Sequence, residues 1–133
     1  MNTTHFLNRI AGNIFRTETS PAIPTEYYIG LSTTEPTMTG ANVSEPSSSF
    51  GYRRVLLENL STPVNGVVTN TANINFEEST SSWGTITHFV IFDAEIGGNL
   101  LMYGPLSTPR VVEENTVMTV RQDYLRLSVQ NPA

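Results

Sequence analysis

The chain lacks cysteine and lysine altogether and is poor in charged residues. Among its 133 residues there are seven cationic side chains, all of them arginine, and charged residues make up 14% of the chain, against about a quarter in average proteins. Because cysteine is absent, there is no disulfide framework and no thiolate metal site. Stability therefore has to come from packing or from association with other subunits.

Two further absences limit the function. The net charge of −5 argues against a nucleic-acid partner, which needs a strongly basic face, although an acidic protein can still dock on a basic one. There is no apolar run of the roughly 20 residues that a membrane span needs, and the start of the chain does not resemble a signal peptide. We therefore expect a soluble chain, made in the cytoplasm, without membrane insertion.

The most informative stretch that is present covers residues 83–106, WGTITHFVIFDAEIGGNLLMYGPL. It is typical of two apolar strands joined by a glycine-rich turn, with the second strand ending at Gly104-Pro105. Alternation in the first strand places Ile86, Val90 and Phe92 on one face, and Phe89 and Ile91 on the other. A strand that is apolar on both faces should be covered on both, as in a sandwich or at a subunit interface.

Short strand patterns with turn signals between them recur along the rest of the chain. They lie at residues 27–31, 52–57, 67–69, 74–76, 109–112, 116–121 and 124–129. Asn65-Gly66 is a tight-turn signal before one of them. This spacing predicts an all-β chain, an antiparallel, jelly-roll-like β-sandwich of about eight strands. We expect a single domain over 1–133, with a helical arm at 1–19 and the sandwich body at 25–133.

Residues 3–16 form the only good helix candidate, with Thr3 or Thr4 as its cap. Its apolar stripe comprises Phe6, Leu7, Ile10, Ala11, Ile14 and Phe15. An isolated helix of this length is marginal in water, so the stripe must pack on something. Two partners remain open: the chain's own β body, or a neighbouring subunit.

The sequence offers no catalytic or metal-binding signature. His5 and His88 are the only histidines, and no nucleophile motif accompanies them. The acidic pairs Glu77-Glu78 and Glu113-Glu114 do not make catalytic carboxylate pairs, since neighbouring strand residues point to opposite faces. Both lie in predicted turns, where we expect them to be solvated. Calcium could find oxygen ligands at Asp93, Glu95 and Asn99, but the EF-hand loop and its spacing are missing. A hairpin turn is the favoured interpretation of this segment. We therefore predict a protein that is not an enzyme and has no cofactor and no metal.

The polar segment 37–51 is the longest expected loop, rich in glycine, proline and serine. With few apolar anchors it should be the most mobile segment of the free chain, or gain order by lying across a neighbour. From this loop, the helix stripe and the aromatic residues at strand ends we select candidate interface residues. They are Phe6, Ile10, Ile14, Met38, Val43, Phe50 and Trp83.

Four pieces of the chain resemble a family of small structural proteins of tailed bacteriophages, commonly labelled phage tail fibre proteins. They are TTHFLNRIAGNIF at the start, YYIGLSTTEPT at 27–37, SEPSSSFGYRRV at 44–55 and the stretch 83–106. The resemblance implies a tail fibre or tail-associated virion subunit, made in the host bacterium, that forms a homo-oligomer, most simply a trimer, and contacts other virion proteins of the tail or capsid. Two alternatives stay open: a capsid decoration protein that clamps capsomers, and a module that binds a host surface glycan or receptor.

Overall fold

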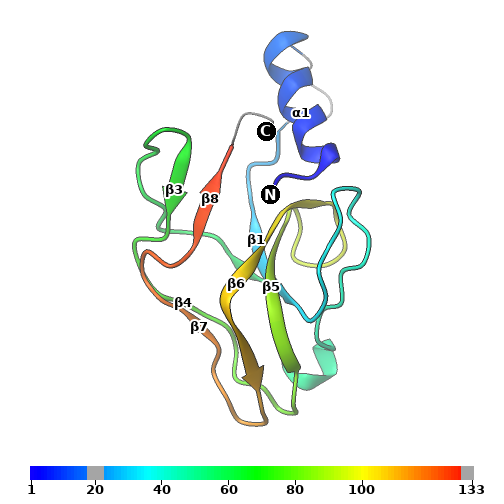
Figure 1. The fold of residues 1–133 in the computed structure, drawn as a ribbon, viewed down its shortest axis with the longest axis vertical. Coiled ribbons are helices and arrows are strands. Elements are labelled where there is room, and N and C mark those ends of the chain that lie inside the picture. The colour runs from blue at the N-terminus through cyan, green and yellow to red at the C-terminus, as the bar shows by residue number, and fades with distance from the viewer. Residues whose placement is uncertain (18–22, 130–133) are drawn as a thin grey trace.

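The computed structural model describes residues 1–17 and 23–129 (Figure 1). Residues 18 and 19 of the predicted arm and residues 130–133 of the predicted body lie outside this part. The elements in chain order are α1 Thr4–Phe15, β1 Tyr28–Ser32, the 3-10 turn η1 Ser48–Phe50, β2 Val55–Leu56, β3 Val67–Thr69, β4 Ile74–Asn75, β5 Gly84–Phe92, β6 Leu100–Val112, β7 Thr119–Val120 and β8 Arg126–Ser128.

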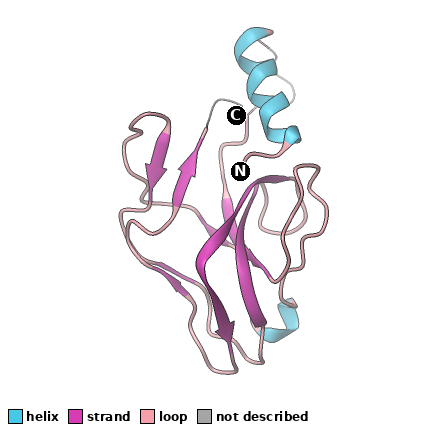
Figure 2. Cartoon of the chain, viewed as in Figure 1, coloured by secondary structure: helices cyan, strands magenta, loops and turns pink. Residues whose placement is uncertain are grey.

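The strands form three small antiparallel sheets (Figure 2). The largest has the order β2-β1-β5-β6, and the pairs β3-β8 and β4-β7 make the other two. This confirms a mostly β chain with an N-terminal helix. The described residues do not show the two facing sheets of a jelly-roll sandwich, because five of the eight strands are only two or three residues long and cannot build a second broad sheet.

Strand β6 is longer than the sequence predicts. It continues through Gly104-Pro105 to Val112, so the prediction that it ends there is wrong. Proline is tolerated at this point because β6 is an edge strand of its sheet. Gly104 is required for a different reason: a Cβ there would lie 2.7 Å from the ring of Phe89.

A bulge in the β5–β6 pairing alters which side chains share a face. The register shifts between Ile86 and His88, and such a shift moves the side chains beyond it to the opposite face. Ile86 consequently packs in the main core together with Ile91, whereas Val90 belongs to a second cluster. The prediction that Ile86 shares a face with Val90 and Phe92 is therefore wrong.

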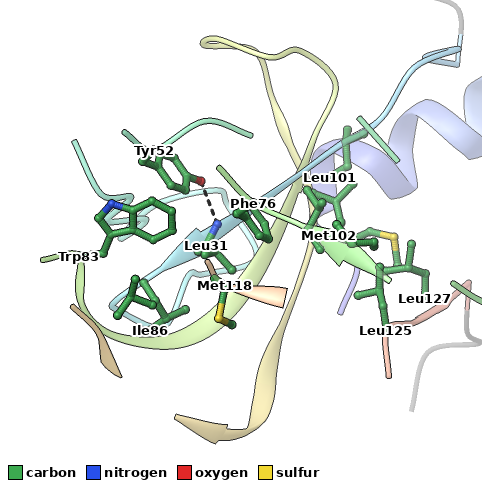
Figure 3. Close-up of a cluster of buried hydrophobic side chains, with 14 of the residues drawn as sticks. Leu31, Tyr52, Phe76, Trp83, Ile86, Leu101, Met102, Met118, Leu125 and Leu127 are labelled. Carbon is green, nitrogen blue, oxygen red and sulfur yellow. Dashed lines mark hydrogen bonds between the residues drawn. The ribbon is translucent and has the colours of Figure 1, made fainter. Parts of the chain in front are cut away.

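The main core draws residues from both ends of the described chain (Figure 3). Tyr52 lies at one end of this core, where its hydroxyl accepts a hydrogen bond of 2.9 Å from the backbone N–H of Leu31. The Tyr52 ring meets Trp83 edge to face at 5.4 Å and stacks on Phe76 at 6.4 Å. At its other end the core includes Leu101, Met102, Leu125 and Leu127.

The second face of the central sheet is covered by the chain itself. Val90, Phe92, Leu100 and Tyr103 form the cluster there, and Val43 from the loop 37–51 packs against it. The guanidinium of Arg54 lies 3.5 Å from the centre of the Phe92 ring, a cation–π contact. Apolar residues on both faces of β5 therefore do not by themselves require a partner subunit.

The loop 37–51 has several internal anchors. Within a turn of the loop, the Thr37 N–H donates to the Ala41 carbonyl at 3.0 Å. A second hydrogen bond, of 2.9 Å, runs from the Thr33 N–H to the Ser44 carbonyl. The buried hydroxyl of Ser32 accepts from the Ser44 N–H. These bonds give the loop a defined path over the sheet; its mobility in the free chain stays a prediction.

Candidate interface surfaces

Helix α1 is anchored by its first turn and by the residues just before it. Thr3 caps the helix, accepting from the Phe6 N–H, which confirms the predicted cap position. The Thr3 hydroxyl also donates to the Leu100 carbonyl at 2.7 Å, and its N–H donates to the Leu101 carbonyl at 2.9 Å. The start of α1 is thereby fixed to the edge of the central sheet along β6.

The two halves of α1 have different surroundings. Phe6 is buried and meets the Tyr27 ring at 6.3 Å, and Ile10 packs against the core. Ile14 and Phe15 are 58% and 83% exposed, and Figure 1 shows this end of α1 standing clear of the sheets. The first half thus packs on its own chain, and the second half leaves its apolar residues open.

The structure divides the predicted interface residues among three environments. Phe6 and Trp83 are buried, Ile10 and Val43 are half-buried, and Ile14, Met38 and Phe50 are exposed. Met38 lies at the start of α1, since its carbonyl accepts from the Thr4 N–H at 2.9 Å. Phe50 is separate from that group: its carbonyl accepts from the Trp83 indole at 2.9 Å. An interface role for all seven stays a prediction.

An Arg54–Glu45 pair ties the loop 37–51 to the body beside an open groove of about 410 Å³. Two hydrogen bonds, of 2.6 and 3.0 Å, join the guanidinium to the Glu45 carboxylate. Two more, of 2.9 and 2.7 Å, reach the carbonyls of Ala94 and Gly97 in the β5–β6 turn. Because these groups are already satisfied, the cluster acts as a structural clamp.

Tyr52 completes this clamp. Its hydroxyl donates to Glu45 while accepting from Leu31. Burial, and then the Glu45 carboxylate, raise the pKa of Tyr52 above its ordinary value. The phenol therefore stays protonated and keeps donating. Arg54 is mostly buried while its neighbour Arg53 is exposed, and no local pattern in the sequence marks Glu45 as the partner of Arg54.

A second groove, of about 430 Å³, separates β6 from the segment that carries β7 and the start of β8. Apolar residues of its lining include Phe89, Leu106 and Met118, and its charged residues are Arg110, Arg121 and Arg126. All three arginines are exposed. Sequence reasoning missed this site; the only signal was the concentration of arginines near the C-terminal end.

The predicted polar candidates occupy structural positions. Within the described part of the chain no group of three His, Cys, Asp or Glu residues is placed to hold a metal ion. The His88 ring meets the neighbouring Thr87 hydroxyl at 2.8 Å. Asp93 accepts from the Asn99 N–H at 2.7 Å, which confirms the hairpin turn. A helix with the length and hydrophobicity of a bilayer span is not found in this described part.

The comparison with protein families shows which family the chain belongs to. Residues 2–128 match the family model described as podophage GP4 fiber I protein gp80. The chain belongs to this family. It is a structural, non-enzymatic fibre component of a podophage virion. No curated protein matches the chain.

The family match confirms several predictions from the sequence. The resemblance to phage fibre proteins, the non-enzymatic role and the virion location are all confirmed. Of the alternatives left open, the fibre is favoured over a capsid decoration protein. Association with other virion proteins follows from membership of a fibre family, and the surfaces described above are the candidates for it.

Proposed function

We propose that this fibre subunit is a single domain that assembles as a homotrimer and attaches to its virion neighbour through the free end of α1. The observation that carries the attachment is the exposure of Ile14 and Phe15 on a helix that projects from the body. Adjacent large apolar side chains in water are a common mark of a protein interface.

Two further observations and one general rule support the proposal. The main core contains residues from α1 and from β8, as expected for one domain. The first turn of α1 is fixed to β6, so the exposed half is held in place and loses little freedom on docking. Closed cyclic symmetry is the usual form of homo-oligomers, and a trimer is what the resemblance to phage fibres implies.

The trimer predicts a mass of three times the 14.7 kDa of the chain. Size-exclusion chromatography with light scattering on the purified chain measures it across a range of concentrations. A mass of one chain that persists at high micromolar concentration would contradict the proposal.

Replacing Ile14 and Phe15 together by aspartate is expected to abolish attachment while the β body stays folded. Neither side chain is in the core clusters, so the carboxylates would be solvated in the free subunit and would be buried only on docking. The measurements are incorporation into particles and far-UV circular dichroism. Ile10 is left unchanged, because it packs against the core.

A matched control carries the same charge at two other exposed apolar positions, Ile96→Asp and Val64→Asp. It should be incorporated like the wild type. If the α1 variant and this control are incorporated equally well, attachment does not use the helix. If the α1 variant loses its β signal, the helix end belongs to the fold.

A further inference from the structure

The groove beside β6 is a local concentration of positive charge on an acidic chain. Arg110, Arg121 and Arg126 form no ion pair with any carboxylate among residues 1–17 and 23–129. By contrast, Arg54 pairs with Glu45 and Arg53 lies 3.9 Å from Glu77. Unpaired guanidinium groups around one groove favour a carboxylate-bearing or other anionic partner.

The lining indicates which kind of anionic partner fits. Pro105 and Pro109 lie in the β6 wall and have no backbone N–H to donate, and an edge with proline is a poor template for an added strand. The residues that line the groove include no Asp, Glu, Asn or Gln, whereas a saccharide needs acceptors for its many hydroxyl donors. Apolar lining with arginines suits an acidic peptide segment flanked by apolar side chains.

The chain itself presents such a segment at residues 111–117, which we call the acidic turn. Glu113 and Glu114 are exposed and form no ion pair with a described residue. The flanking Val111 and Val117 are 64% and 51% exposed. Figure 1 places this turn, between β6 and β7, at the end of the molecule opposite α1. A contact through the acidic turn therefore leaves the exposed end of α1 free for attachment.

The acidic turn is held rigid by a buried serine. The hydroxyl of Ser79 donates to the Glu113 carbonyl and accepts from the Thr116 N–H. The backbone carbonyl of Ser79 accepts from the Asn115 N–H at 2.8 Å. Asn115 has a φ of 60°. A turn ordered in advance gives up little conformational freedom on binding.

We propose that the acidic turn of one subunit docks in the arginine groove of the next copy of the chain. In the proposed trimer each groove receives the turn of the next copy, so the contact runs head to tail and closes as a ring when the rotation between copies allows. This inference rests on the proposed homotrimer and gives it a specific interface. Since the contact depends on exposed charges, added salt should weaken it.

A charge exchange tests the inference on the full chain. The groove variant carries Arg121→Glu and Arg126→Glu, and the turn variant carries Glu113→Arg and Glu114→Arg. Each is expected to weaken trimer association by about tenfold or more, and the combined variant should return to within about threefold of the wild type. Analytical ultracentrifugation measures the association, with far-UV circular dichroism as the check on folding.

Two controls match these changes away from the proposed contact. Arg53→Glu introduces a negative charge outside the groove, and Glu26→Arg with Glu58→Arg reverses two exposed carboxylates, one just before β1 and one just after β2. Both should associate like the wild type. An oligomer that the groove and turn variants leave unchanged, or that the combined variant fails to restore, overturns the inference alone and leaves the trimer standing. A wild-type chain that stays monomeric overturns both proposals.

Discussion

Replacing Glu45 by alanine is expected to lower the free energy of unfolding by about 3–5 kcal/mol, because it leaves a buried cation without its partner. The side chains of Arg54 and Glu45 are only 9% and 19% exposed. The change also removes the acceptor of the Tyr52 hydroxyl inside the main core and releases the loop 37–51 from the sheet. Urea unfolding followed by circular dichroism measures the loss.

The control for this prediction is Glu58→Ala, an exposed carboxylate with no ion pair among the described residues. It should change stability by less than about 0.5 kcal/mol. Arg54→Met removes the positive charge of Arg54 but keeps an apolar side chain near the Phe92 ring. It therefore separates the contribution of the ion pair from that of packing on Phe92. If Glu45→Ala unfolds at the same urea concentration as Glu58→Ala, the pair is not a clamp.

Local signals in the sequence predicted the elements that depend on neighbouring residues. The cap at Thr3 and the apolar stripe define α1 within its own residues. Asn65-Gly66 forms the expected tight turn, with positive φ at both residues and reciprocal hydrogen bonds of 3.0 Å between Val64 and Val67. Such features follow from steric and hydrogen-bonding preferences that act within a few positions.

Features set by distant contacts could not be predicted in the same way. The continuation of β6 past Pro105 depends on its place at the edge of the sheet, which no local pattern specifies. The bulge near His88 shifts the register and so defeats simple alternation along β5. The Glu45–Arg54 pair joins the loop 37–51 to the residue just before β2, and charge patterning alone cannot select one partner among many.

For the candidate interface, too, local patterns were predictable from the sequence and long-range contacts were not. Periodicity correctly grouped Phe6, Ile10 and Ile14 on one stripe, but it could not show that the chain covers the first two and leaves the third open. The groove arginines were missed because they come from β6 and from the region of β7 and β8. Only the fold brings these segments to one surface.

Replacing Trp83 by alanine is expected to cost about 3–5 kcal/mol of folding stability, as for other large aromatic residues in a core. The side chain is 4% exposed, meets the Tyr52 ring edge to face and donates to the Phe50 carbonyl (Figure 3). Its removal would open a cavity and leave a carbonyl without its donor. The measurement is again the free energy of unfolding in urea.

Trp83→Phe and Phe50→Ala separate this core role from the interface role that the sequence suggested. Trp83→Phe keeps much of the apolar volume and should lose only part of the stability, while Phe50→Ala, at a partly exposed site, should lose about 1 kcal/mol or less. If Trp83 acts only in the core, Trp83→Phe should weaken assembly only to the extent that it lowers the fraction of folded chain. If Trp83→Phe stays folded but fails to assemble, the indole contacts a neighbouring subunit, and the burial seen in the single chain has to open when the fibre forms.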